Sequence, residues 1–434
     1  MEVALSRAMT AIGDLDRVDC WMRAVAGTLL AFGLIGCGAS TSPCQLAAEH
    51  VASCLGETTG TTTGSCDADG AASILAQSCE QITGASGKFD NVITSLICRI
   101  TGHFCPTPSA SIPPLKYGEA SADQIAAEAS EFEGYAMQIQ QVQRNNQQVH
   151  GGAIDRGFHQ KTHICVQGQL DVDPNRPDFA QFGVFAQMRS YPIWIRFSNS
   201  VGYSQSDALP DTRGMAIKVQ GADGYAAVQD FLGSTAPTQL FPDAKGAMEY
   251  ALMNSDPDPL VYPKYLADNP SIALGVAKYA TTFPLITTSL VNQDFWSSSV
   301  ISLGPRAVKF NYQPCQDKVP LDFLTSEYLS DDLKARLAQQ SICYNFRVQF
   351  QADTGSTVAT PIEDASAAWT TPFYVVGKIT IPQKSSSDIE EESAACASMS
   401  FSPWNTLAEH TPLGNTNRAR KAIYEASRAN RQGH

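Results

Sequence analysis

Short apolar runs separated by turn residues dominate the chain from residue 155 onward. Alternating or continuous Val, Ile, Phe and Tyr positions predict six strands between residues 166 and 381. A helix is predicted at about 271–280, between the third and fourth strands. Many strands at moderate spacing with a helical insertion indicate an α+β domain, a closed antiparallel barrel with helices packed outside it. The six strands are expected at 166–172, 193–197, 215–219, 307–312, 346–351 and 373–381.

Helices are also predicted before and after these strands. Ser121 and Gln124 have the spacing of a capping box that opens a helix continuing to about residue 147. Gln and Asn crowd this helix after Met137, so we expect a solvated arm or a partner-facing helix and not a core element. The final segment, 417–431, is helical in composition and rich in arginine.

The N-terminus has the pattern of an export signal. Arg23 precedes an uncharged run, 24–36, which is short for a membrane span but suits a signal peptide; an ordinary buried helix is the alternative. The run ends in Leu-Ile-Gly-Cys, which resembles the lipobox of bacterial lipoproteins, with Cys37 as the lipidated residue. Four acidic residues before Met22 do not suit a signal, so Met22 is the expected true start. We expect an exported lipoprotein, anchored by lipid to a membrane, at the outer membrane or facing the periplasm.

Cysteine placement agrees with an oxidising compartment. Seven of the 12 cysteines fall between Cys37 and Cys105. Zinc modules usually have tight Cys-x2-Cys pairs, whereas the spacings here are wide and irregular, so disulfides are favoured over zinc. Which of these cysteines pair is left open by the sequence.

Composition and punctuation divide the chain into four parts. A signal peptide (1–36) is followed by a Cys-rich stalk or disulfide module (37–106), a Pro-rich linker (107–120) and the barrel domain (121–434). Hydrophobic residues make up 43% and charged residues 17%, as in soluble proteins with a sizeable core. The net charge of −13, without a basic stripe over the main body, argues against nucleic acid as a partner.

Three clusters of polar and aromatic residues carry candidate chemistry. Residues 156–161 read Arg-Gly-Phe-His-Gln-Lys and lead into a predicted strand. Residues 191–199 read Tyr-Pro-Ile-Trp-Ile-Arg-Phe-Ser-Asn, and 211–218 read Asp-Thr-Arg-Gly-Met-Ala-Ile-Lys. The third cluster, 420–424, reads Arg-Lys-Ala-Ile-Tyr, with Arg431 seven residues beyond the tyrosine.

This combination resembles the heme catalase family, and more closely its smaller catalase-related members that lack accessory domains. The resemblance covers roughly residues 153–431. It implies a heme b whose iron is bound by a tyrosine on one side and faced by a histidine on the other.

The tyrosine of the resemblance is Tyr424, the expected axial ligand of the heme iron. A free tyrosine has a pKa of about 10, so a nearby cation is needed to favour the phenolate. Arg420 lies four residues earlier, on the same helix face. In the family an Arg-x-x-x-Tyr helix serves this purpose, and an arginine at the position of Arg431 pairs with a heme propionate. A solvated basic helix is the alternative for this segment alone.

The resemblance implies that His159, three residues after Arg156, acts as general base and then general acid on a bound peroxide. It also implies that Ser198 orients the imidazole, and that Arg156 and Arg196 pair bidentately with the propionates. From the residues alone, a zinc site at His159-x3-His163 is a competing interpretation, but it lacks a third ligand. A lone histidine on a strand is more often a satisfied structural residue, and His163 is interpreted as one.

Three departures from the family pattern bear on the activity. Thr235 stands where catalases have an asparagine beside the peroxide, Phe158 is bulkier than the usual residue, and Glu-Ala-Ser at 425–427 replaces Pro-Asp-x-His. A threonine donates one hydrogen bond to a peroxide, and an apolar wall favours organic substrates.

We therefore expect a heme-dependent enzyme that metabolises hydroperoxides and has weak catalase activity. It would act as a peroxidase or as a converter of lipid hydroperoxides similar to the allene oxide synthases with a catalase-like core. A homodimer is a further expectation. The alternatives are a heme-binding surface lipoprotein without catalysis, which would have no use for Ser198 behind His159, and a structural lipoprotein that has lost heme.

Overall fold

The computed structural model describes residues 120–432, except 224–226, 285, 317–324 and 353–355. These residues fall within one of the two units into which the chain divides. The predicted signal peptide, the lipidation site Cys37, the Cys-rich segment and the Pro-rich linker up to residue 119 lie outside the described residues and stay predictions. Among the helices that are described, none is long and apolar enough to cross a membrane.

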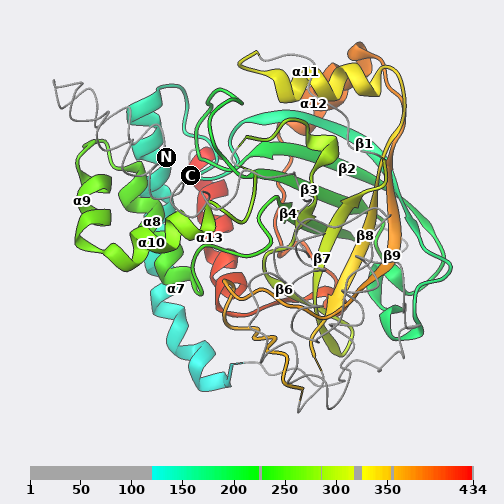
Figure 1. The fold of residues 1–434 in the computed structure, drawn as a ribbon, viewed down its shortest axis with the longest axis horizontal. Helices are drawn as coiled ribbons and strands as arrows, with labels where there is room; N and C mark the ends of the chain where they lie inside the picture. Colours follow the sequence, from blue (N-terminus) through cyan, green and yellow to red (C-terminus); the bar gives the residue numbers. More distant parts are fainter. Residues whose placement is uncertain (1–119, 224–226, 285, 317–324, 353–355, 433–434) are drawn as a thin grey trace, which may run out of the picture. The chain divides into compact units, whose positions relative to one another are not determined.

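An antiparallel sheet closes on itself to form a barrel (Figure 1). Strand β7 pairs with β8 on one side and with both β5 and β6 on the other, so that β5 and β6 share one of eight positions around the barrel. The α+β barrel predicted from the sequence is thereby confirmed. The strands are β1 (Thr162–Val172), β2 (Ser190–Asn199), β3 (Arg213–Gln220), β4 (Val228–Ser234), β5 (Phe295–Trp296), β6 (Val300–Leu303), β7 (Arg306–Pro314), β8 (Ile342–Phe350), β9 (Phe373–Ile381) and β10 (Pro412–Leu413).

All six predicted strands are present, as β1, β2, β3, β7, β8 and β9. The strand β4 escaped prediction because its sequence, Val-Gln-Asp-Phe-Leu-Gly-Ser, buries polar as well as apolar side chains: Gln229 and Asp230 are 1% and 2% exposed. The other three strands have two to four residues, too few to show a period.

Aromatic side chains fill the barrel interior. Phe185, Phe231, Phe310 and Phe346 are each at most 3% exposed, and their rings pack in edge-to-face and tilted pairs. His410 lies against this cluster, and burial lowers its pKa to about 4, so its imidazole is neutral. The interior is therefore a packed core, and a ligand site has to be built on the outside of the barrel wall.

Helices cover the barrel on two sides (Figure 1). One group contains α7 and α13, which lie side by side, together with α8 to α10. The helices α11 and α12 lie over the barrel near β1. Their bounds are α7 (Ala122–His150), α8 (Ala244–Ser255), α9 (Val261–Asp268), α10 (Pro270–Tyr279), α11 (Tyr328–Leu337), α12 (Ser386–Cys396) and α13 (Asn415–Gln432).

The first of these helices corrects one prediction. The capping box at Ser121 is confirmed, but α7 is a core element and not a solvated arm. Ile139, Val142 and Gln143 are each at most 2% exposed. The Gln143 amide donates to the backbone oxygens of Asp155 (2.6 Å) and Ser427 (3.1 Å). Polar side chains can be buried when the backbone satisfies them, so the Gln and Asn content did not indicate exposure.

One disulfide joins the barrel to a surrounding helix, and a second joins the residue after β7 to the neighbouring strand β8 of the barrel. Cys165 on β1 is bonded to Cys396 at the end of α12, across 231 residues, and Cys315 is bonded to Cys343. These cysteines follow the N-terminal cluster on which the disulfide prediction rested, and the sequence predicts no pairing for them.

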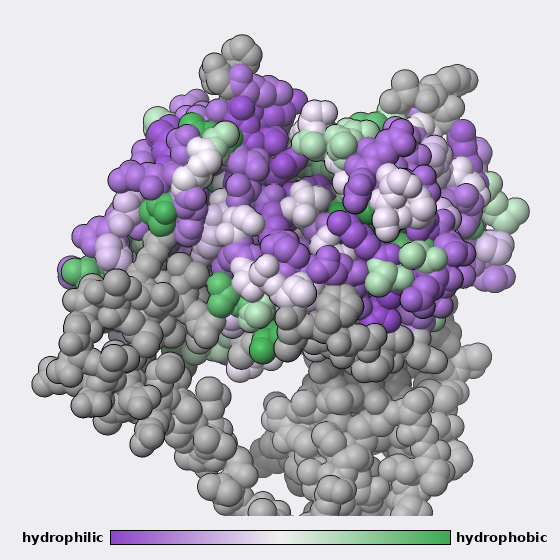
Figure 2. Space-filling model, turned by 90° about the horizontal axis from the view of Figure 1, so that it is seen from above, coloured by the Kyte–Doolittle hydropathy of each residue, from purple (hydrophilic) through white to green (hydrophobic). Residues whose placement is uncertain are grey.

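The part of the surface described in Figure 2 is mostly hydrophilic, with apolar residues in small groups. Exposed large apolar side chains are dispersed over separate elements, such as Met137 on α7 and Leu274 on α10. A continuous apolar patch of the kind that marks a permanent interface is not seen on this face. The homodimer stays a prediction.

Candidate functional site

Two adjoining cavities meet on the outer side of the barrel. The first has about 750 Å³, its open mouth included, and lies between β2, β3 and β4 of the barrel wall and the helices α7 and α13. The second has about 2310 Å³, again with its open mouth included, and extends between α7, α8, α10 and the loop 200–212. The two cavities are neighbours, because five residues line both of them. These are Gly157, Phe158, His159, Ile423 and Tyr424.

The helix α13 presents Tyr424 to both cavities. The residue Arg420, one turn earlier, donates from Nη2 to the Tyr424 hydroxyl over 2.9 Å. The side chain of Asn417 holds the same guanidinium, with its Oδ1 3.0 Å from Nη1. The predicted Arg-x-x-x-Tyr contact is therefore present, and a cation stands ready to stabilise a phenolate at this position.

His159 enters the site from the segment before β1 with an unusual backbone. Its φ is +56°, and it is one of two described non-glycine residues in the left-handed region. Its Nδ1 lies 2.6 Å from the backbone oxygen of Asn199 and 3.2 Å from Ser198 Oγ. Because a carbonyl can only accept, Nδ1 carries the proton, and Nε2 keeps its lone pair.

The electrostatic surroundings keep this imidazole neutral. Burial lowers the pKa of His159 to about 4, and the charges of Arg196, Arg420 and Arg156 also lower it, against the opposing effect of the Asn199 carbonyl. Near pH 7 the group is thus a free base that can accept a proton at Nε2.

Gly214 on β3 provides the space for this ring. A Cβ at that position would stand 2.8 Å from both His159 Nδ1 and Ser198 Oγ. The glycine was part of the quoted motif, but it received no role from the sequence, since nothing in the pattern indicates which side chain lies above it.

We expect Gly214→Ala to displace the imidazole while leaving the barrel intact. The added methyl group would have to push His159 or Ser198 away, and with them the Nδ1 contact to Asn199. Peroxide consumption by the heme-loaded protein should fall at least about tenfold, as is usual when a catalytic group is misplaced by a fraction of an ångström. Circular dichroism melting beside kinetics checks this. An alanine variant with full activity would mean that Gly214 does not shape the site.

Arginines gather at the first cavity. Arg156, Arg196, Arg428 and Arg431 line it, and the nearby carboxylate is Asp155, 3.6 Å from Arg156 and 4.0 Å from Arg431. Burial lowers the pKa of Arg196 to about 9, and the charge of Arg156 adds to this. The Nε of Arg431 is buried without a hydrogen-bond partner. Such an excess of positive charge, with Arg196 itself buried, favours an anionic ligand.

One arginine is held differently from the expectation. Arg196 donates from Nε and Nη2 to Thr162 Oγ1, and from Nη2 also to the backbone oxygens of His159 and Gln160. This leaves Nη1 as its donor toward a carboxylate, so the bidentate pairing predicted for Arg196 does not match the geometry. Arg196 instead braces the backbone of His159.

Thr235 is the predicted site residue that the structure does not bring to the others. It follows β4, is 5% exposed and lines neither cavity. Its Oγ1 accepts a hydrogen bond from the backbone nitrogen of Arg213 over 2.9 Å. The alignment position alone could not reveal that this hydroxyl faces the β3 backbone.

His163 is also separated from the site. It is 4% exposed and lines neither cavity. Both of its ring nitrogens are buried without hydrogen-bond partners, which corrects its interpretation as a satisfied residue. Within the described ranges, no group of three His, Cys, Asp or Glu side chains could hold a metal ion.

The residues at the two cavities fit a heme. A tyrosine with an arginine beside it and a neutral histidine line the same two cavities, and the arginines of the first cavity, one with an unpartnered buried donor, could pair with heme propionates. Apolar side chains make up much of the remaining wall. These are Ile139, Met215, Ala216, Leu232, Phe401 and Ile423.

Comparison with known proteins agrees with this description. No protein-family model matches the chain. A catalase-related peroxidase of Mycolicibacterium paratuberculosis (strain ATCC BAA-968 / K-10) is 31% identical over 206 residues, which cover 44% of this chain and 63% of the relative. A bacterial catalase structure covers 75% of this chain and 64% of its own, with a TM-score of 0.52 and 16% identity.

The chain has a catalase-like fold. Two further solved catalases have a similar fold. Catalase A from Saccharomyces cerevisiae matches with a TM-score of 0.52 and 13% identity over 65% of this chain and 62% of its own. A fungal catalase matches with a TM-score of 0.52 and 15% identity over 66% of this chain and 61% of its own. The matched segments span less than two thirds of the length of each of these relatives. Similarity of fold does not establish an activity, so the activity is argued from the residues that line the two cavities.

Proposed function

We propose that this catalase-like protein is a heme-dependent enzyme that consumes hydroperoxides. Tyr424 would bind the iron of a heme b and His159 would act as the acid and base on the opposite side. The heme would be held by ligation, ion pairs and packing, since no cysteine of the described residues lines either cavity. One observation carries the proposal. The Tyr424 phenol, which Arg420 contacts, and the neutral His159 line the same two cavities.

The protein's own residues would move one proton. Bound heme supplies the redox chemistry, because its iron exchanges electrons with a peroxide. The lone pair on His159 Nε2 accepts the proton of the hydroperoxide, and the resulting imidazolium returns it to the departing oxygen. The contact from Nδ1 to the Asn199 carbonyl persists in both states, because Nδ1 carries a proton throughout. A heme carrier without turnover would not need this arrangement.

The second cavity favours organic hydroperoxides over hydrogen peroxide. Its accessible volume of about 440 Å³ far exceeds the space that hydrogen peroxide needs, and aromatic side chains line much of it. Phe158, the bulky residue noted in the sequence, lines both cavities and is 40% exposed, so it stands where a substrate would pass. Burial of apolar substrate surface there is worth about 0.8 kcal/mol per methylene. Besides Tyr424, the Phe and Tyr residues of this lining are Phe158, Tyr203, Phe241, Tyr250, Tyr262, Tyr279 and Phe283.

Heme-loaded protein should therefore turn over cumene hydroperoxide and linoleic acid hydroperoxide faster than hydrogen peroxide. The measurements are the absorption spectrum, substrate loss for each peroxide, and oxygen release. We expect a ratio of kcat/KM of at least about tenfold in favour of the organic substrates, since several buried methylenes exceed the 1.4 kcal/mol that a factor of ten requires. Vigorous oxygen release with no organic turnover would identify an ordinary catalase, and stable heme binding with no turnover of any peroxide would identify a carrier.

A further inference from the structure

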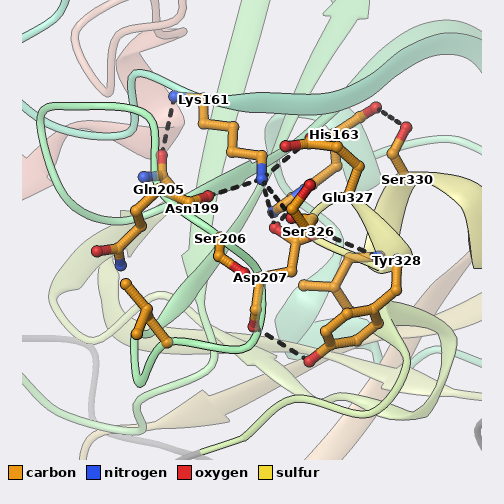
Figure 3. Close-up of polar contacts among 12 residues, drawn as sticks. Lys161, His163, Asn199, Gln205, Ser206, Asp207, Ser326, Glu327, Tyr328 and Ser330 are labelled. Carbon is orange, nitrogen blue, oxygen red and sulfur yellow. Dashed lines mark hydrogen bonds and ion pairs between the residues drawn. The ribbon is translucent and has the colours of Figure 1, made fainter. Parts of the chain in front are cut away.

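A buried ion pair stands two residues beyond His159 (Figure 3). Lys161 Nζ lies 2.7 Å from Asp207 Oδ1, and the two side chains are 5% and 0% exposed. A second carboxylate, from Glu327, approaches the same Nζ to 3.0 Å from the solvent side, where it is 54% exposed. Charges so deeply buried are costly unless they are paired and hydrogen-bonded, so this contact is a fixed feature of the fold.

The ion pair joins three parts of the chain. Lys161 Nζ also donates to the backbone oxygens of Gln205 (2.8 Å) and Ser326 (3.3 Å). Asp207 Oδ2 accepts from the backbone nitrogen of Leu329 over 2.9 Å. The start of β1, the loop 200–212 and the start of α11 are thereby tied to one point, as the dashed contacts around Lys161 in Figure 3 show.

The same lysine is connected to the catalytic candidate through its backbone. The Lys161 nitrogen donates to Asn199 Oδ1 over 2.9 Å, and the Asn199 nitrogen donates to the Lys161 oxygen over 3.1 Å. Asn199 Nδ2 donates to the Tyr203 oxygen, which belongs to the tied loop. These bonds hold Asn199 through its backbone N–H and its side-chain amide. Its backbone carbonyl accepts the hydrogen bond from His159 Nδ1.

We propose that Lys161, Asp207 and Asn199 form a positioning clamp that sets the tautomer of His159 by fixing the Asn199 carbonyl. The three clamp residues line neither cavity, so they would act on His159 only through the backbone around it. The consequence for catalysis rests on the proposed function. The tautomer of His159 is a property of the folded chain and does not depend on that function.

The nearby imidazole does not replace lysine as the partner of Asp207. His163 Nδ1 lies 3.7 Å from Asp207 Oδ1, beyond hydrogen-bond distance. Burial lowers the pKa of His163 well below its ordinary value, and Arg213, Lys161 and Arg196 lower it further, so the ring is neutral. Lys161 is therefore the cation that neutralises Asp207.

The test is the double variant Lys161→Met with Asp207→Asn, which removes both charges and leaves neither one buried alone. Full-length protein with 15N-labelled histidine would be loaded with gallium protoporphyrin, a diamagnetic analogue of ferric heme. Long-range 1H–15N spectra report the tautomer, and His159→Gln identifies the signal. We expect only the Nδ1–H form in the unaltered protein and a mixture of forms in the double variant. With heme, kcat/KM for peroxide should fall about 10- to 100-fold, as when outer-shell hydrogen bonds are lost.

A matched control separates positioning from general destabilisation. Lys384 and Glu392 form another Lys–carboxylate pair, 2.7 Å apart, between α12 and the segment preceding it. Lys384→Met with Glu392→Gln should leave the His159 tautomer and the peroxide kinetics unchanged. If the Lys161 double variant does not fold, Asn199→Ala tests the same carbonyl without a change of charge, and it should give the same mixture of tautomers.

A single Nδ1–H tautomer in a folded clamp variant would overturn the proposal, and so would an equal shift in the control. The fate of the proposed function is measured separately. If the unaltered chain binds no porphyrin or consumes no peroxide, that function fails, while the tautomer of His159 can still be read on the porphyrin-free chain and decides whether the clamp exists.

Discussion

Tyr424→Phe should remove heme from the protein. The substitution deletes the one oxygen that Arg420 Nη2 contacts on α13 and keeps the ring, so the packing of the helix survives while the candidate ligand is lost. We expect heme affinity to fall roughly 100-fold or more, about 2.8 kcal/mol of binding free energy. The measurements are the heme-to-chain ratio after purification and the dissociation constant from a Soret titration.

Tyr135→Phe provides the control for this substitution. Tyr135 belongs to the same apolar cluster as Tyr424, but among the described residues its hydroxyl donates to Glu131 alone, at 3.2 Å, on its own helix. Its heme content should remain that of the unaltered chain. Full heme content with an unchanged Soret band in the Tyr424 variant would remove Tyr424 as the iron ligand and with it the central claim about this site.

His159→Gln should abolish most peroxide turnover without loss of heme. Glutamine fills similar space and can contact the Asn199 carbonyl, but it has no lone pair that takes up a proton near neutral pH. We expect kcat to fall by about 10² to 10⁴, the usual contribution of a general acid or base. Stopped-flow measurement of peroxide loss at equal heme content checks this, and a variant within threefold of the parent's rate would assign the proton transfer to another group.

The pH profile of the unaltered enzyme tests the same side chain without mutation. The neutral imidazole is the active form, and burial lowers its pKa to about 4. Turnover should therefore persist through pH 6.5, where an ordinary histidine would already be half protonated, and decline only as pH falls through about 4. This acid limb should be absent in the His159→Gln variant.

Periodicity and motif spacing predicted much of this molecule. The strands with clear apolar repeats were predicted correctly, because strands that bury side chains in a barrel core have apolar residues at regular positions. The helix α13 was also predicted. The pairs Arg420–Tyr424 and His159–Ser198 also meet as expected. The first pair lies one helical turn apart, while the second depends on the register of β2 beside the start of β1.

Features that depend on tertiary surroundings could not be predicted in this way. Gln143 is buried because two carbonyls from distant segments satisfy it, and no local pattern records that. Thr235 occupies the expected alignment position, but its hydroxyl turns to the Arg213 nitrogen. The second cavity has walls from several separate segments, so no single stretch of sequence carries its signature.

The bond between Cys165 and Cys396 has a consequence for a cleaved chain. It closes a loop of 231 residues, and His159 precedes the loop while Tyr424 follows it. A single proteolytic cut anywhere inside the loop would separate the polypeptide into a fragment with His159 and a fragment with Tyr424, yet the disulfide would keep them covalently joined. Nicked protein should therefore migrate as one species in a non-reducing gel, and a reductant should release the histidine-bearing and tyrosine-bearing fragments from each other.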